Sequence, residues 1–190
     1  MQSDQQLVAE ALEGSQDAYR ELVRRYATPL FRLVRRMVRD DSLAEDLTQE
    51  TLVKAFAALG SYDPGRRLAS WLFKIAHNTT IDHLRRGQLA TTPLAAEEGD
   101  VQGPLDRLAD PSLPSPEERA RGADLARDLT AAVAALDLRY RELVLLRFQE
   151  GLEYQEIAEV TGLPLGTVKT RLHRGRKRLA ELLAERGWTP

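Results

Sequence analysis

The chain has 190 residues, of which 43% are hydrophobic and 29% are charged, and its formal net charge is −2. This composition is typical of a globular protein and excludes a chain that is disordered or membrane-embedded throughout. The sequence has no apolar run of about 18 residues or more, no secretory signal at its start, and no cysteine that could form a disulfide or a thiolate zinc site. The lack of cysteine fits a reducing compartment, and we expect a cytoplasmic protein that is not inserted in a membrane.

The charges divide the chain into three parts. Residues 1–87 carry 13 basic and 12 acidic side chains, residues 88–118 carry 1 and 7, and residues 119–190 carry 13 and 10. The acidic middle part also holds five of the nine prolines, which disfavour helix and sheet. It predicts a flexible linker between two small domains, with a short helix near residues 104–109 as an alternative for part of it.

Helical spacing dominates both flanking parts, and strand-like alternation is nearly absent, so the sequence predicts an all-α fold. In the first domain, apolar residues recur every three or four positions over residues 22–33, and Pro29 within this run predicts a kink or a break between two helices. Further helices are expected at about 42–59 and 69–86, separated by the turn GSYDPG.

The expected helix at 42–59 has two different faces. The residues expected to pack inward are Ala44, Thr48, Leu52, Ala55 and Leu59. Asp46, Gln49 and Glu50 share the opposite face, next to Val53. Like charges four residues apart are unfavourable by about 0.2–0.5 kcal/mol. From spacing alone this is more simply an ordinary solvated face, and the functional alternative is a docking face for a basic partner protein.

The expected helix at 69–86 mixes aromatic, basic and amide side chains. We expect Trp71, Leu72, Ile75 and Ala76 in the core and Lys74, His77, Asn78, Arg85 and Arg86 at the surface. Such a mixture beside a loop suits single-stranded nucleic acid, whose unstacked bases and backbone charges both need partners. The simpler interpretation makes Trp71 a core residue and the helix a structural one.

The second domain is predicted to hold helices at about 117–135 and, capped by Asp137, up to Glu150, followed by a helix-turn-helix. Its first helix ends at Gly162, because glycine readily takes the left-handed conformation of a helix stop. The second helix lies within LPLGTVKTRLHRGRKRL, residues 163–179, which has six basic residues and no acidic one.

This last helix is predicted to be amphipathic. Its buried stripe comprises Val168, Leu172, Gly175 and Leu179, and its polar face comprises Thr170, His173, Arg174 and Lys177, flanked by Lys169. A helix of this kind can enter the major groove of duplex DNA, where basic side chains pair with guanine and meet phosphates. A solvated basic helix without a ligand is the alternative, but the helix-turn-helix pattern in front of it favours DNA binding.

Three stretches together resemble the extracytoplasmic-function group of bacterial RNA polymerase sigma factors. They are EDLTQETLVKAF, SWLFKIAHNTTIDHLRR and LDLRYRELVLLRFQEGLEYQEIAEVTGLPLGTVKTRLHRGRKRL, in this order. The resemblance covers nearly all of the chain outside residues 88–115. It implies two helical domains that bind core RNA polymerase and promoter DNA, and it implies an anti-sigma factor as a further partner.

The same resemblance assigns roles to individual residues. Asp46, Gln49 and Glu50 would bind core polymerase. Lys74 and Asn78, with the loop at residues 61–67 as a base pocket, would read and melt the −10 promoter element. The residues that would read the −35 element as duplex are Lys169, Thr170, Arg171, His173, Arg174 and Lys177.

Two other classes of function remain to be compared with this one. A helix-turn-helix regulator that acts without polymerase would explain residues 119–190 but leave residues 1–87 without a task. An enzyme is disfavoured, because GLPLG lacks the lysine and spacing of a phosphate-binding loop. His77 and His83 lie on different helix faces and make a poor metal pair. We therefore expect no catalytic residue, no metal and no cofactor.

Overall fold

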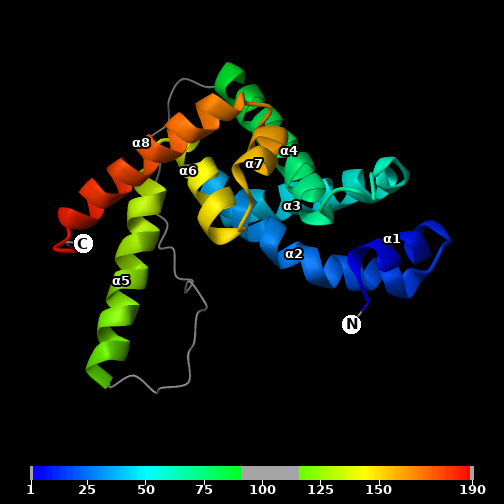
Figure 1. Cartoon of the computed structure of the whole chain (residues 1–190), viewed down its shortest axis with the longest axis horizontal. Helices are drawn as coiled ribbons and strands as arrows, with labels where there is room; N and C mark the ends of the chain where they lie inside the picture. The colour runs from blue at the N-terminus through cyan, green and yellow to red at the C-terminus, as the bar shows by residue number, and fades with distance from the viewer. Residues whose placement is uncertain (1, 91–115, 189–190) are drawn as a thin grey trace.

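The structure is a computed structural model that describes the backbone of residues 2–90 and 116–188 and the side chains of residues 2–86 and 122–188. All regular secondary structure in these ranges is helical, which confirms the all-α prediction. The helices form an N-terminal body, α1 to α4, and a C-terminal body, α5 to α8 (Figure 1). No helix in the described ranges is both long and apolar enough to cross a membrane.

The N-terminal body is built around its longest helices. It contains α1 (Asp4–Leu12), α2 (Gln16–Val38), α3 (Asp41–Ala57), a 3-10 turn (Leu59–Ser61) and α4 (Leu68–Ala90). Helix α2 packs against α1, α3 and α4, and its Leu30, Leu33 and Val34 are completely buried. Burial of such side chains is the main source of stability for a body of this kind.

Short polar side chains mark where the N-terminal helices begin. Ser3 and Gln6 form a reciprocal capping box on α1, and the side chain of Ser15 accepts a hydrogen bond from the backbone of α2. Asp40 does the same for α3. Each cap satisfies backbone donors that a helix start leaves without partners.

Pro29 does not break α2, which runs without interruption from Gln16 to Val38. The prediction of a break between two helices at this proline is therefore wrong. A proline inside a helix costs about 3 kcal/mol. Leu22 lies before it and Leu30 and Leu33 after it, all of them buried on the same side of α2, and their burial outweighs that cost.

The C-terminal body contains the expected helix-turn-helix. Its elements are α5 (Pro116–Ala135), α6 (Leu138–Val144), a π-helix (Leu145–Gln149), α7 (Tyr154–Thr161) and α8 (Leu165–Ala184). Helix α8 packs against α5, α6 and α7. The indole Nε1 of Trp188 donates to Asp128 Oδ2 at 2.7 Å, which ties the segment after α8 to α5.

One turn of π-helix continues α6, which makes the two together reach the predicted end near Glu150. Leu145 and Leu146 are both buried in it, whereas Phe148 is 58% exposed. A π-turn holds an extra residue compared with an α-helical turn, and two consecutive leucines can thereby face the interior. Asp137 occupies the N-cap of α6, but its side chain makes no capping hydrogen bond.

The two bodies are in direct contact. Helix α7 packs against α4, and α6 packs against α2 (Figure 1). Helix α4 extends past residue 87 and α5 begins at Pro116, so both helices enter the ends of the predicted linker at 88–118. The rest of that linker, including the alternative helix near residues 104–109, lies outside the described residues.

Candidate polymerase and nucleic-acid interfaces

The acidic face predicted on α3 is exposed. Asp46, Gln49 and Glu50 all lie at the surface, and Val53 beside them is 69% exposed. On the opposite side, Ala44, Thr48, Ala55 and Leu59 are buried and Leu52 is partly buried. The predicted division of this helix into an inward and an outward face is thus confirmed, and the outward face combines charge with an apolar side chain.

An ion pair within the helix supports this face. Lys54 Nζ lies 2.7 Å from Glu50 Oε1. The hydrogen bond from Lys54 holds the pKa of the Glu50 carboxyl below its usual value, so this side chain is ionised at neutral pH. The pair offsets the repulsion between Asp46 and Glu50, which are four residues apart.

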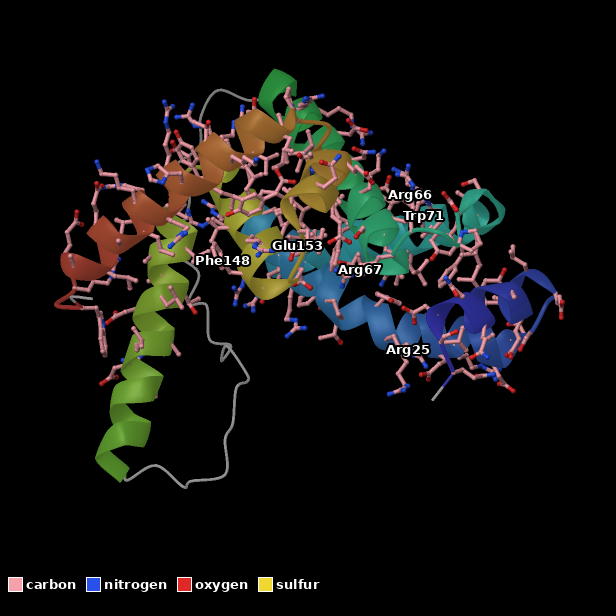
Figure 2. The ribbon with its side chains drawn as sticks, viewed as in Figure 1. Arg25, Arg66, Arg67, Trp71, Phe148 and Glu153 are labelled. Atoms are coloured by element: carbon pink, nitrogen blue, oxygen red, sulfur yellow. The ribbon has the colours of Figure 1, made fainter. Side chains whose placement is uncertain are left out.

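The loop before α4 is held by Tyr62 of the loop itself and by Trp71 of α4. The Tyr62 hydroxyl donates to the carbonyl oxygen of Arg66 at 2.6 Å, and the Tyr62 and Trp71 rings lie 5.6 Å apart. The backbone N–H of Gly65 donates to Asp63 Oδ1 at 2.9 Å. These contacts fix the loop at residues 61–67 against the first turn of α4. Arg66, Arg67 and Trp71 in this region are labelled in Figure 2.

Along α4, Lys74 and Asn78 are exposed, as expected. Leu72 and Ala76 are buried, and Trp71 and Ile75 are partly buried. The expectation that His77 is exposed is wrong. Its side chain is only 12% exposed and its Nδ1 contacts Glu142 of α6, a residue of the other body.

The start of the helix-turn-helix is fixed by two glutamates and a glycine. Glu153 and Glu156 form a capping box at the N-terminus of α7, and Gly162 ends this helix with φ of 68°. That left-handed conformation favours glycine because it has no side chain. Ile157 and Val160 are buried and orient α7 relative to α8.

Helix α8 has the predicted buried stripe and polar face. Val168 and Leu172 are buried, and Leu179, also predicted in this stripe, is only partly buried. A Cβ atom at Gly175 would lie only 3.2 Å from Val144 Cγ2, so this glycine lets α6 approach α8 closely. The exposed residues of the polar face are Lys169, Thr170, His173, Arg174 and Lys177, and Arg171 is partly exposed. A row of basic and hydroxyl groups on one helix face suits phosphates and base edges.

The structure also brings together residues that the sequence did not connect. Ser70, Glu156 and Glu159 meet Arg66 and Arg67 where α7 contacts the loop and the first turn of α4. Ser70 lies in α4 and the two glutamates lie in α7, whereas the two arginines lie in the loop before α4. Local sequence patterns give no sign of a partner about 90 residues away.

Comparison with known proteins identifies both bodies. Residues 22–89 match the Sigma-70 region 2 family and residues 126–179 match the Sigma-70, region 4 family. The ECF RNA polymerase sigma factor SigW of Bacillus subtilis is 32% identical over 94% of this chain and 95% of its own length. The chain belongs to the ECF sigma factors. This confirms the resemblance seen in the three sequence stretches.

Solved structures agree with this assignment. CnrH of Cupriavidus metallidurans, in complex with the cytosolic domain of CnrY, has a TM-score of 0.65 at 28% identity and covers 96% of this chain and 97% of its own. The sigma factor RpoE of Bartonella quintana, in complex with the anti-sigma factor NepR, has a TM-score of 0.64 at 26% identity, covering 87% and 96%.

As an ECF sigma factor, the chain is a transcription initiation factor that directs RNA polymerase to promoters. A helix-turn-helix regulator that acts without polymerase is not favoured, because such a protein has no need of a region 2 body. In this ECF sigma factor, residues 22–89 form such a body, and it precedes the helix-turn-helix in the chain.

Proposed function

We propose that the two bodies of this ECF sigma factor divide promoter recognition between them. The body at 1–87 docks on core polymerase and recognises and melts the −10 element, and the body at 119–190 recognises the −35 element, with residues 88–118 as the linker. The observation that carries the proposal is that the polar residues assigned to each task lie exposed on one face of one helix or beside it.

The docking surface is the α3 face formed by Asp46, Gln49 and Glu50. Its two carboxylates attract a basic partner, and Val53 adds an apolar contact at 69% exposure. Interfaces of this kind depend on a few central contacts surrounded by charges that set orientation. Both groups of the Glu50–Lys54 ion pair are exposed. On docking, Glu50 can therefore keep this partner or exchange it for a basic group of the polymerase.

The −10 element is bound on α4 and the loop at 61–67. Lys74 neutralises backbone phosphate, and the amide of Asn78 can hydrogen-bond to the edge of an unstacked base. Trp71 is partly buried against Tyr62, so it supports the loop more than it stacks on bases.

The −35 element is bound as duplex by α8. The residues in contact with DNA are Lys169, Thr170, Arg171, His173, Arg174 and Lys177. The Thr170 hydroxyl donates to the carbonyl of Gly166 at 2.9 Å, and its oxygen can still accept a hydrogen bond. His173 and Arg174 lie near the middle of the exposed face and provide base contacts, while the outer basic residues meet phosphates.

The remaining properties follow from this role. The protein acts in the cytoplasm, where polymerase works, and its activity is binding rather than catalysis of its own. Because RpoE of Bartonella quintana was solved with the anti-sigma factor NepR, we include an anti-sigma factor among the partners of this chain.

Transcription in vitro with core polymerase tests the proposal. The chain should confer start sites on genomic DNA that core polymerase alone does not use, as read by sequencing of the transcripts. Asp46→Ala combined with Glu50→Ala should weaken binding to core polymerase about tenfold, measured by fluorescence anisotropy of the labelled chain.

The matched control is Glu13→Ala combined with Asp17→Ala, which removes the same charge from two exposed positions at the junction of α1 and α2. This control should bind polymerase like the unchanged chain. Equal weakening in both variants would show that the α3 face is not the docking surface. The absence of any new start site would contradict the sigma function itself.

A further inference from the structure

A basic cleft lies beside the α8 face that is proposed to bind the −35 element. It has a volume of about 430 Å³ and lies between the start of α6 and the middle of α8, two helices that pack side by side (Figure 1). The cleft is lined by four basic side chains, Arg139, Arg174, Lys177 and Arg178, and by two carboxylates, Asp137 and Glu181. Because Arg174 and Lys177 also belong to the polar face of α8, the cleft is continuous with the surface that is proposed to face DNA.

Each carboxylate of the cleft is paired with one of its basic residues. Arg139 Nη2 lies 3.0 Å from Asp137 Oδ2. Arg178 Nη1 lies 3.1 Å from Glu181 Oε2. The other two basic residues of the lining take no carboxylate from it. The cleft therefore has an excess of positive charge, which attracts an anion.

The pair formed by Arg139 and Asp137 can exchange its carboxylate for a phosphate. The two side chains are 60% and 64% exposed, and ion pairs at such exposure add little to stability. A phosphate accepts the same charge-assisted hydrogen bonds, and the planar guanidinium can donate two of them in parallel. Arg139 therefore loses little when a phosphate takes the place of Asp137.

Two neighbouring residues hold Arg139 at the edge of the basic face. Its Cζ lies over the ring of Tyr140, 4.9 Å from the ring centre, a distance at which a cation is attracted to the ring. A guanidinium over a ring keeps the N–H groups at its edge available to an anion. A Cβ atom at Gly175 of α8 would lie 3.4 Å from Tyr140 Cβ, so this glycine lets the start of α6 pack closely against α8. The packing thereby brings Arg139 into one cleft with basic residues of α8.

We propose that this cleft binds a phosphate of the DNA backbone beside the −35 element, and that Arg139 of α6 is a DNA-binding residue of this ECF sigma factor. The inference rests on the proposed role of α8. A duplex that receives α8 in its major groove presents phosphates on both sides of this helix, and the cleft lies along one side. Phosphate contacts fix the register of a protein on the duplex and do not read its sequence. Arg139 therefore positions α8 on the DNA, while α8 itself contacts the bases.

The salt dependence of duplex binding tests the contact through Arg139→Ala. The probe is a fluorescent duplex of about 20 base pairs, two turns of B-DNA, that carries the −35 sequence of a promoter found by transcript sequencing. Each phosphate contact adds about 0.9 to the slope of log affinity against log salt concentration. Between about 50 mM and about 200 mM potassium chloride, the advantage of the unchanged chain over Arg139→Ala should therefore shrink about threefold. Fluorescence anisotropy of the duplex measures both affinities.

Arg127→Ala is the matched control. Arg127 pairs with Asp124 of α5 at 3.0 Å and is exposed, so this variant loses an equivalent ion pair of the same body, but Arg127 does not line the cleft. It should keep the salt slope of the unchanged chain. The loss of affinity in Arg139→Ala should be the same for matched and altered −35 sequences, and the Tm of either variant should change by no more than about 4 °C.

Asp137→Asn should have the opposite effect. Asp137 occupies the N-cap of α6, a place where asparagine is as favourable as aspartate, so the helix is kept. Without this carboxylate nothing competes with the phosphate for Arg139, and the affinity for the duplex should rise about two- to threefold. The control is Asp124→Asn, which frees Arg127 in the same way and should raise the affinity less.

Changes in the duplex identify the phosphate. An uncharged methylphosphonate group replaces one phosphate at a time on both flanks of the −35 element. At one position or two adjacent ones, it should weaken binding of the unchanged chain and of Arg127→Ala about three- to tenfold. The same replacement should have no effect on Arg139→Ala, because two changes that remove one contact are not additive.

The proposal would be overturned by an Arg139→Ala salt slope equal to that of the control, or by the absence of any phosphate whose neutralisation depends on Arg139. A cleft that binds a free phosphate compound and not DNA would give both of these results. Failure of the sigma function is distinguishable, because it appears as the absence of new start sites. The salt slope can then still be measured on a duplex of arbitrary sequence, since phosphate contacts do not depend on sequence.

Discussion

The two surfaces proposed to bind DNA are in opposite situations. On α8, Lys169, His173 and Arg174 are exposed to solvent. On the loop before α4, Arg66 and Arg67 are held by glutamates of α7. The side chains of Arg66 and Arg67 are nevertheless 59% and 56% exposed, so the difference lies in which groups the basic side chains contact and not in whether solvent reaches them.

The largest effect is expected from substitutions that destabilise the core of one body and leave the other unchanged. Leu172→Ala removes a side chain that is 2% exposed and should lower the free energy of unfolding by about 2–5 kcal/mol. Leu33→Ala, at 0% exposure in α2, should cost a similar amount. Urea denaturation measures both.

Binding separates the two variants further. Leu172→Ala should impair binding of −35 duplex more than docking on polymerase, and Leu33→Ala should do the reverse. A cost below about 1 kcal/mol for either variant would mean that its position is not part of a well-packed core.

A smaller effect is expected on the exposed surface of α8. Arg174→Ala should reduce discrimination for the −35 element by about 1–3 kcal/mol, the value of a good base contact. Promoter titrations with matched and altered −35 sequences measure it. Arg178→Ala is the control, because Arg178 pairs with Glu181 on the same helix at 3.1 Å. Equal loss of discrimination in both variants would mean that Arg174 contacts phosphate and not a base.

The smallest effect is a dependence on pH of the contact between α7 and the start of α4, which is closed in this structure. In the closed chain the pKa of Glu156 lies below its ordinary value of 4.5, because its hydrogen bonds and the charge of Arg67 outweigh burial. On opening, Glu156 loses Arg67 and Ser70, and its pKa rises toward that value. The open chain then binds more protons, so closure is fully supported above the ordinary pKa and weakens as pH falls through the lowered one.

Pulsed electron paramagnetic resonance of a chain with spin labels at Ala57→Cys and Ala184→Cys, both exposed positions, measures this effect between about pH 6 and pH 3. The other charged groups that line the cavity between α7 and the start of α4 are Arg66, Lys74 and Glu159. Because Arg67 is 56% exposed, the effect should stay below about 1 kcal/mol. Glu156→Gln should reduce the dependence on pH, and an equal dependence in this variant would assign it to other carboxylates.

Local patterns in the sequence were sufficient for most of the helices and for the faces of α3 and α8. The inward set of α3 and the buried stripe of α8 follow from the helical period alone. The unbroken course of α2 through Pro29 was not predictable in this way, because it depends on how much apolar surface is buried on both sides of the proline. Helix α1 was not predicted, although Ser3 and Gln6 form its capping box.

Contacts between the two bodies could not be predicted from the sequence. The sequence predicts His77 at the surface, together with the other polar side chains of α4. It is covered by Glu142, a residue 65 positions away. Polar side chains at such interfaces have the same local pattern as solvated ones, so only the arrangement of the bodies reveals their partners.

The π-helix at Leu145–Gln149 sets the orientation of α7 and α8 relative to α6. An α-helix advances by about 100° per residue, so the additional residue of this turn rotates everything that follows it. Deleting one position here would leave the chemistry of α7 and α8 intact but point both helices in a new direction. The length of this turn therefore sets the orientation of the whole helix-turn-helix. Insertions and deletions at residues 145–149 should be tolerated far less than substitutions.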